Sequence, residues 1–401
     1  MNPIRLKKAA SLLALLALLA SFGTTARSAV AAPIAILFVG NSYTFSRVDP
    51  AMSYNAAAVH DLTARFHAIS AVGSRPWEPH PWGGIAGLFK QMTQEAGLDY
   101  DVSISARNGV SLRGHFLNTA NPAWDLRGNV ASRRWDVVVL QEQSDAALPP
   151  GRGKNANFAQ FRAYADALEN FIHQGGARSI SEAALYGSLA ACEAGGQTPG
   201  GCATVRHIEA NPHANPQAEV YLTQTGARPD MVYPHRLTVA DKSSGDGRPL
   251  VDQGATGGAA TLYYADLASM TRDLHEAMCN AAAANPQLRG VVWVGDAFQR
   301  AVDEGAVKHA GFYDAAGSHA APQTGEPMNL WWDDYLHSSK YGSYLDALMQ
   351  FGTITGRNPL TLGAGETAAR DLGISPSQAL RLQHIAADQM AAAATRRTSC
   401  H

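Results

Sequence analysis

The sequence is poor in cysteine and carries no excess of charge of either sign. Its 401 residues include four cysteines, and the formal net charge at pH 7 is -2. This balance gives no basic surface for nucleic acid or anionic lipid, so we expect no nucleic-acid partner. Cys-x-x-Cys pairs and clusters of His and Cys with ligand spacing are also missing, so no zinc site is predicted.

Long apolar runs are equally scarce. The run at 9–20 is shorter than the ~20 residues that a membrane span requires. It follows basic residues and leads into small residues that end at 29–31, the layout of a secretory signal. We therefore expect residues 1–32 to be a cleavable signal peptide rather than an anchor. No cysteine follows the run to take a lipid, so a secreted or periplasmic protein with no stable membrane anchor is predicted.

Export to an oxidising compartment would give the cysteines a structural use. Four cysteines allow three pairings, which the sequence leaves open. The favoured one joins Cys192 to Cys202 across a short Gly-rich loop and leaves Cys279 to reach Cys400.

The remaining residues, 33–401, are sufficient for one α/β domain. Short Val/Ile/Leu runs predict buried parallel strands at 34–39, 100–105, 136–140, 220–223 and 290–294. Helix-compatible segments separate them, at 85–96, 158–174 and 259–284. Strands that alternate with helices predict a three-layer α/β/α sandwich, with a flavodoxin-like parallel sheet of about five strands.

Two stretches exceed a minimal version of that fold. Residues 46–83 are rich in proline and aromatic residues and predict a long loop with some helix. Residues 185–260 are rich in Gly, Pro, Asn and Asp, and we expect an insertion there near the C-terminal edge of the sheet, where it would shape a substrate site.

The first predicted strand leads into a Gly-Asn-Ser turn, at 40–42, with a helix-compatible segment after it. At the C-terminal edge of an α/β sheet, such a turn can present the Ser42 hydroxyl to a substrate beside backbone N–H groups. Asp334 and His337 follow near the other end of the chain. Their spacing lets the acid orient the imidazole while its second nitrogen faces Ser42, so a Ser-His-Asp triad is predicted. Two alternatives stay open: Ser42 as a helix cap, and Asp333 as the orienting acid.

These segments resemble blocks of the SGNH (GDSL-type) hydrolase family over residues 34 to about 359. The first block is similar to the turn at 40–42, with Asn41 where the family usually has Asp. The last block matches Asp334 and His337 in the same chain order. Residues 107–112 are similar to the second block, and the resemblance implies that Gly109 donates its backbone N–H to an oxyanion together with the N–H of Ser42. A turn glycine with positive φ is the alternative for Gly109.

The third block departs from the family's Gly-x-Asn-Asp. Residues 141–145 are Gln-Glu-Gln-Ser-Asp, closer to the Gln-Gly-Glu-Ser of some carbohydrate acetylesterases in the superfamily. The resemblance implies that a glutamine amide replaces the asparagine in the oxyanion hole. Gln143 is favoured slightly over Gln141, and Ser144 is a third candidate.

Two further features stay open between a functional and a structural role. The segment at 222–230, which contains Arg228, is similar to a fourth-strand exit in SGNH relatives, and either lines the site or is a plain strand exit. Trp331 and Trp332 precede the Asp-His loop and either stack on a sugar ring or pack in the core.

The resemblance implies an exported serine esterase that forms an acyl-enzyme and needs no metal or organic cofactor. Its expected substrate is a small-molecule or carbohydrate ester, with acetyl esters of carbohydrate favoured. Three other functions remain open: an inactive carbohydrate-binding protein of SGNH fold, an acyltransferase with the same triad, and a turn that binds phosphate or flavin.

Overall fold

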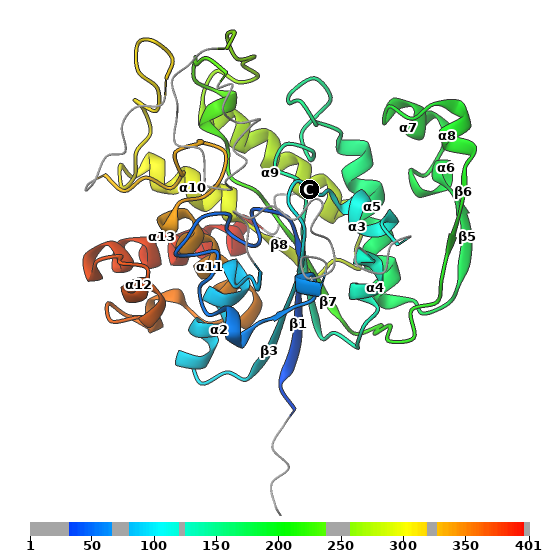
Figure 1. Cartoon of the computed structure of the whole chain (residues 1–401), viewed down its shortest axis with the longest axis horizontal. Coiled ribbons are helices and arrows are strands. Elements are labelled where there is room, and N and C mark those ends of the chain that lie inside the picture. The colour runs from blue at the N-terminus through cyan, green and yellow to red at the C-terminus, as the bar shows by residue number, and fades with distance from the viewer. Residues whose placement is uncertain (1–31, 66–79, 120–124, 238–256, 319–326, 397–401) are drawn as a thin grey trace, which may run out of the picture. The chain divides into compact units, whose positions relative to one another are not determined.

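The computed structural model describes residues 32–65, 80–119, 125–237, 257–318 and 327–396 (Figure 1). The described residues from 33 onward belong to the larger of two compact units. The expected signal peptide, apart from Ala32, and Cys400 lie outside the described residues. Within those residues no helix is long and apolar enough to cross a membrane.

The larger unit is built on a parallel sheet with the strand order β2-β3-β1-β4-β7-β8. The expected strands are all present, as β1 (Ile34–Gly40), β3 (Tyr100–Ala106), β4 (Val137–Gln141), β7 (Glu219–Thr223) and β8 (Gly290–Val292). Their order, with the second strand of the five outside the first, is the flavodoxin-like order. The predicted α/β class is confirmed. The sixth strand, β2 (His60–Asp61), has only two residues, too few to leave a pattern in the sequence.

Both faces of the sheet are buried, which explains the continuous apolar runs of β1 and β4. Along β1, Ile36 and Phe38 enter one hydrophobic core, while Leu37 and Val39 enter the other. Alternate side chains of a strand point to opposite faces, so a strand buried on both sides is apolar at most positions, although β3 also buries Ser103 and Ser105.

Helices cover each face (Figure 1). The core that contains Ile36 is closed by α2 (Gly84–Glu95), α10 (Val294–Asp303), α11 (Lys340–Thr355), α12 (Thr367–Asp371) and α13 (Pro376–Arg396). The other core is closed by α3 (Leu112–Leu117), α4 (Leu126–Val130) and α5 (Phe158–His173). One helix, α9 (Leu267–Ala284), contributes to both, with Met270 in the first core and Met278 in the second.

Two predicted boundaries were wrong. The helix expected at 259–284 begins only at Leu267, because the Asp266 side chain accepts the N–H of Ser269 and caps it there. The strand expected at 290–294 ends at Val292, since β7 ends at Thr223 and offers no partner beyond that register. Val294 is instead the first residue of α10, with its side chain buried.

The expected insertion at 185–260 is not continuous, because β7 of the central sheet lies within it. A small unit precedes β7, made by the antiparallel pair β5 (Arg178–Ser181) and β6 (Val205–Ile208). Between these strands lie α6 (Glu182–Leu185), α7 (Leu189–Ala194) and α8 (Pro199–Ala203). Residues 238–256 lie outside the described part of the chain.

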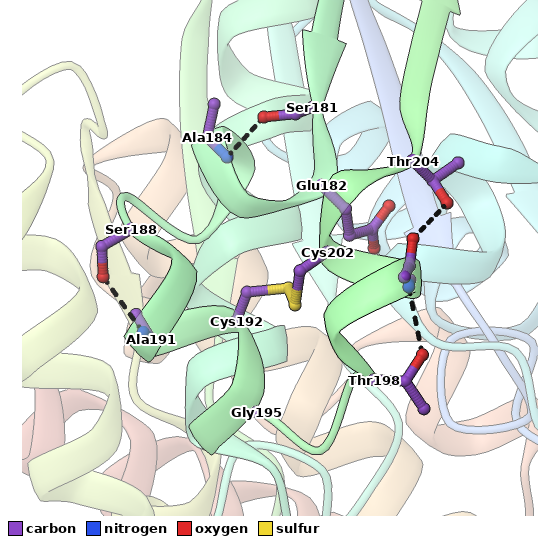
Figure 2. The surroundings of a disulfide bond; sticks show 12 residues. Ser181, Glu182, Ala184, Ser188, Ala191, Cys192, Gly195, Thr198, Cys202 and Thr204 are labelled. Atoms are coloured by element: carbon purple, nitrogen blue, oxygen red, sulfur yellow. Dashed lines mark hydrogen bonds between the residues drawn. A yellow bond between two sulfur atoms is a disulfide. The ribbon is translucent and has the colours of Figure 1, made fainter.

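A disulfide between Cys192 and Cys202 holds α7 against α8, with the Cα atoms 5.9 Å apart (Figure 2). The favoured short-loop pairing is thus present. Beside it, the buried carboxylate of Glu182 accepts hydrogen bonds from the Tyr164 hydroxyl and from Arg206. The small unit is therefore stabilised by a covalent bond and a buried ion pair rather than by a large apolar core.

Candidate active site

Three side chains from the two ends of the chain meet in series. The Oγ of Ser42 lies 2.8 Å from Nε2 of His337, and Nδ1 of the same ring lies 2.6 Å from Oδ2 of Asp334. Ser42 is 5% exposed and His337 is 3% exposed. A hydroxyl, an imidazole and a carboxylate in this order can move a proton from the hydroxyl to the ring while the acid stabilises the resulting imidazolium.

The turn at residues 40–42, called the nucleophile turn from here on, begins where β1 ends and is tightly packed. A Cβ on Gly40 would lie 2.0 Å from the Thr44 Oγ1 and 2.5 Å from the Gln141 Oε1, so only glycine fits. Asn41 is buried, accepts the N–H of Tyr43 and donates from Nδ2 to the carbonyl of Val110 at 3.0 Å. A carboxylate at this position could not donate the last bond, so this contact requires an amide.

The segment after Ser42 is a series of turns and not the helix that was expected. The N–H of Phe45 donates to the carbonyl of Asn41, and the N–H of Arg47 to that of Ser42, both at 3.1 Å. These single bonds do not continue into a helix in the described part of this segment. A helix-capping role therefore does not account for Ser42.

Gln141 supports the turn from behind. Its Oε1 accepts the N–H of Asn41 at 3.1 Å and the hydroxyl of Thr44 at 2.9 Å, and its Nε2 donates to the carbonyl of Glu142. Both ends of the Gln141 amide are thus engaged within the protein.

His115 holds the same turn from α3. Its ring is fully buried, and Nε2 lies 2.7 Å from the carbonyl of Gly40. Burial lowers the pKa of His115 to about 4, so the ring is neutral and donates its Nε2 hydrogen to that carbonyl.

Asp334 and His337 are shaped into one loop by backbone hydrogen bonds. Oδ1 of Asp334 accepts the N–H of Leu336 at 3.0 Å and that of His337 at 2.8 Å. Tyr335, the residue that follows Asp334, adopts a φ of 51°, which is uncommon for a residue other than glycine. Burial alone would raise the pKa of Asp334, but its electrostatic interaction with the His337 ring and the N–H donors of the loop hold this pKa far below its ordinary value. The acid therefore stays ionised.

Asp333 does not take the orienting position, because the contact to Nδ1 comes from Asp334. The negative charge of Asp333 acts instead on Lys308, whose pKa is lowered by burial and partly restored by this charge.

The second predicted block lies beside the nucleophile turn. The N–H of Arg107 donates to the carbonyl of Gly40 at 3.2 Å, and the carbonyl of Val110 accepts from Asn41. Gly109 adopts a φ of +67°, a backbone conformation that favours glycine, as the turn-glycine alternative expected. In the described residues, the N–H groups of Ser42 and Gly109 have no acceptor. Two free donors on adjoining turns can stabilise an oxyanion.

Gln143 differs from Gln141. Its side chain is half-buried, and its Oε1 is buried without a hydrogen-bond partner in the described part of the protein. An unengaged amide at this position is able to turn its NH2 group toward a ligand.

Ser144 and Arg228 belong to a polar cluster next to the site. The Ser144 hydroxyl accepts from the Nη1 of Arg228 at 2.9 Å, and Asp230 binds the same guanidinium through both of its oxygens. Asp145 lies 3.7 Å from Nη1. Arg228 is thus already neutralised by two carboxylates, which suits a structural role for this residue.

Trp331 is 3% exposed, donates from Nε1 to the carbonyl of Ala227 at 2.9 Å, and packs against Phe298 and Phe312. Packing therefore accounts for Trp331, while Trp332 is only half-buried.

The described residues contain no group of three or more His, Cys, Asp or Glu side chains that could hold a metal ion. The part played by Tyr43, Glu142 and His115 was missed from the sequence. Tyr43 and Glu142 adjoin predicted site residues, yet Tyr43 donates to the carbonyl of Leu336 and Glu142 accepts the N–H of Leu112, two backbone groups that are distant along the chain.

No family model matches the sequence, and no curated protein matches it. The solved structures that the chain matches include a protein from Slackia heliotrinireducens that is proposed to be an SGNH hydrolase. That match has 16% identity, covers 80% of this chain and 100% of that chain, and has a TM-score of 0.34. A DUF4886 family protein from Bacteroides uniformis has 12% identity, covers 89% of this chain and 94% of that one, and has a TM-score of 0.40. A carbohydrate esterase family 2 enzyme with a carbohydrate binding domain, from Corynascus thermopiles (Myceliophthora fergusii), has 12% identity, 66% and 57% coverage, and a TM-score of 0.27.

Proposed function

We propose that this protein is an exported serine esterase that hydrolyses carboxylic esters, with acetyl esters of carbohydrate as its substrate class. The observation that carries the proposal is the contact series from Ser42 through His337 to Asp334, with distances of 2.8 and 2.6 Å. A buried hydroxyl that touches an imidazole, which in turn touches an ionised carboxylate, is the arrangement that activates a serine for acyl transfer.

In the proposed reaction, Ser42 Oγ attacks the ester carbonyl and gives its proton to Nε2 of His337. The carbonyl oxygen becomes an oxyanion, stabilised by the N–H groups of Ser42 and Gly109 and by the Gln143 amide. Collapse of the tetrahedral intermediate expels the alcohol, which takes the proton from His337 and leaves an acyl-enzyme. Water then attacks the acyl group with His337 as base, releasing the acid and restoring Ser42.

The ionised state of Asp334 supports this sequence of steps. His337 gains a positive charge in each transition state, and the adjacent carboxylate stabilises that charge. The acid also fixes which ring nitrogen faces the serine, because its contact with Nδ1 leaves Nε2 to accept the proton. No step calls on a metal or an organic cofactor.

Turnover of short esters tests the proposal. We expect the purified protein to release p-nitrophenol from p-nitrophenyl acetate and acetate from O-acetylated oligosaccharides, and Ser42→Ala to lose both activities. Faster turnover of long-chain lipid esters or of thioesters would contradict the substrate class. Transfer of the acetyl group to an added sugar in preference to water would identify an acyltransferase, and a wild-type protein inactive on every ester would overturn the proposal.

Export and the second disulfide belong to the same proposal. The Cys192–Cys202 bond fits an oxidising compartment. We expect the protein recovered outside the cytoplasm to begin near residue 33. Non-reducing peptide mapping should join Cys279 to Cys400, and separate alkylation of these two residues would contradict the pairing.

A further inference from the structure

Glu142 lies between the two glutamines of the third block. It is 2% exposed and follows directly after β4. Among the described residues, no Arg, Lys or His forms an ion pair with the Glu142 carboxylate, and the charge that acts on it is that of Asp145. A buried carboxylate without a cation costs free energy, so its presence requires an explanation in its contacts.

The contacts of Glu142 reach both sides of the predicted oxyanion hole. Its Oε1 accepts the N–H of Leu112 at 3.1 Å and that of Gln143 at 2.6 Å, and its Oε2 lies 3.3 Å from the N–H of Leu112. Leu112 is the first residue of α3, three residues after Gly109. One carboxylate therefore fixes the backbone of Gln143 and the end of the loop that carries Gly109.

The same network extends to the nucleophile. The backbone carbonyl of Glu142 accepts from Gln141, whose Oε1 accepts the N–H of Asn41. The loop that precedes Leu112 is tied to Asn41 through the carbonyl of Val110. Glu142 thus lies where three segments meet: the nucleophile turn, the Gly109 loop and the exit of β4.

Building on the proposed function, we infer that Glu142 is a positioning residue. Its carboxyl oxygens hold Gly109 and Gln143 where their donors and the N–H of Ser42 bind the same oxyanion. Its role depends on its acceptor atoms, because both bonds come from backbone N–H groups. Burial raises the pKa of Glu142 to about 7, although the N–H donors of Gln143 and Leu112 lower it in part. The protonated acid still has a carbonyl oxygen that accepts hydrogen bonds, so the positioning role of Glu142 does not require a charge.

The test compares Glu142→Gln with Glu142→Leu. The glutamine keeps an acceptor oxygen at the same reach, and we expect its kcat to stay within about threefold of wild type, whereas the leucine variant should lose about 100-fold in kcat with KM changed by less than about threefold. A second readout is the affinity for an aryl boronic acid. Ser42 Oγ adds to boron, the serine proton passes to His337, and the resulting tetrahedral anion places an oxygen where the oxyanion forms. Glu142→Leu should weaken this affinity by a similar factor.

Glu366 provides the matched control. It is also a buried glutamate that accepts two backbone N–H groups, from Ala368 at 2.9 Å and Ala369 at 2.6 Å, and it caps α12. Glu366→Leu should lower the melting temperature and leave kcat and boronate affinity unchanged. If Glu142→Leu does not fold, Glu142→Asp replaces it, because the shorter side chain withdraws the carboxylate from Leu112 and should show the same loss.

Two results would overturn the inference. One is a folded leucine or aspartate variant with wild-type kcat and boronate affinity, and the other is a glutamine variant impaired as strongly as the leucine variant. Ester turnover that is lost in Ser42→Ala but retained in Glu142→Leu removes this inference alone. A wild-type protein that neither hydrolyses esters nor binds the boronate overturns the proposed function and this inference together.

Discussion

The hydroxyl of Tyr43 donates a hydrogen bond to the backbone carbonyl of Leu336 at 2.6 Å. Tyr43 follows the serine that is proposed as nucleophile, and Leu336 precedes the histidine that contacts it. The rings of Tyr43 and His337 also approach each other, with centroids 5.6 Å apart. This bond joins two loops that are 293 residues apart in the sequence and fixes how closely the serine approaches the imidazole.

Tyr43→Phe should therefore lower kcat on an acetyl ester by about 2- to 12-fold, the value of one ordinary hydrogen bond, with KM nearly unchanged. Steady-state kinetics measure both. Tyr341→Phe is the matched control, since its hydroxyl donates to Gln378 at 3.4 Å. Equal losses of kcat in the two variants would show that the Tyr43 bond has no special role.

The two neighbouring acids should behave differently. Asp334→Asn removes the charge that contacts Nδ1 and also permits the wrong tautomer of His337, so kcat should fall by about 10^4-fold. Asp333→Asn leaves that contact in place and should retain most of the activity. Comparable kcat values for the two variants would contradict the assignment of Asp334.

Variants of the two glutamines should lose different properties: a Gln143 variant should lose kcat, and a Gln141 variant should lose stability. Gln143→Leu removes an amide proposed to bind the oxyanion, so kcat should fall by about 10^2- to 10^3-fold while the free energy of unfolding is preserved. Gln141→Leu leaves the N–H of Asn41 and the hydroxyl of Thr44 without their acceptor, which should lower that free energy by about 1–3 kcal/mol. Denaturant titration and kinetics on both variants would distinguish the roles. A Gln143 variant with normal kcat would exclude it as a donor.

Much of this arrangement was predictable because it is local in sequence. The central strands β1 and β4 are runs of apolar residues buried on both faces, a pattern that a sequence shows directly. Asp334 and His337 lie within one loop, and Gly40 and Gly109 occupy positions that exclude a side chain or require positive φ. These features depend on a few adjacent residues.

The remainder depends on contacts that the sequence does not record. The choice between Gln141 and Gln143 is set by which amide meets the N–H of Asn41, across 100 residues of chain. Glu142 resembles any strand-exit glutamate until its N–H donors from Leu112 and Gln143 are known. The start of α9 was predicted too early because the residues before the cap at Asp266 are as compatible with helix as those after it.

Asp346 should make stability depend on pH. This buried residue of α11 accepts a hydrogen bond from Gln350 at 3.1 Å, and burial raises its pKa from 3.8 to about 7. The folded state therefore holds the proton more tightly than the unfolded state. The resulting stabilisation is complete below about pH 4 and is lost as the pH rises through about 7.

Asp346→Asn removes this dependence, because the amide does not titrate. Between pH 5 and pH 8 the wild-type protein should lose about 2–3 kcal/mol more unfolding free energy than the variant, as measured by urea titration at each pH. Asp99→Asn, at an exposed position, controls for the loss of one charge. Parallel pH profiles for wild type and Asp346→Asn would contradict the raised pKa.

The central claim is that Ser42 is the activated nucleophile, and covalent labelling tests it most directly. A fluorophosphonate should react with the wild-type protein at one serine, and peptide mapping should locate the adduct on Ser42. Ser42→Ala should not be labelled, and His337→Ala should react far more slowly because no base removes the serine proton. An adduct on any other serine, or equal labelling of wild type and Ser42→Ala, would contradict the account.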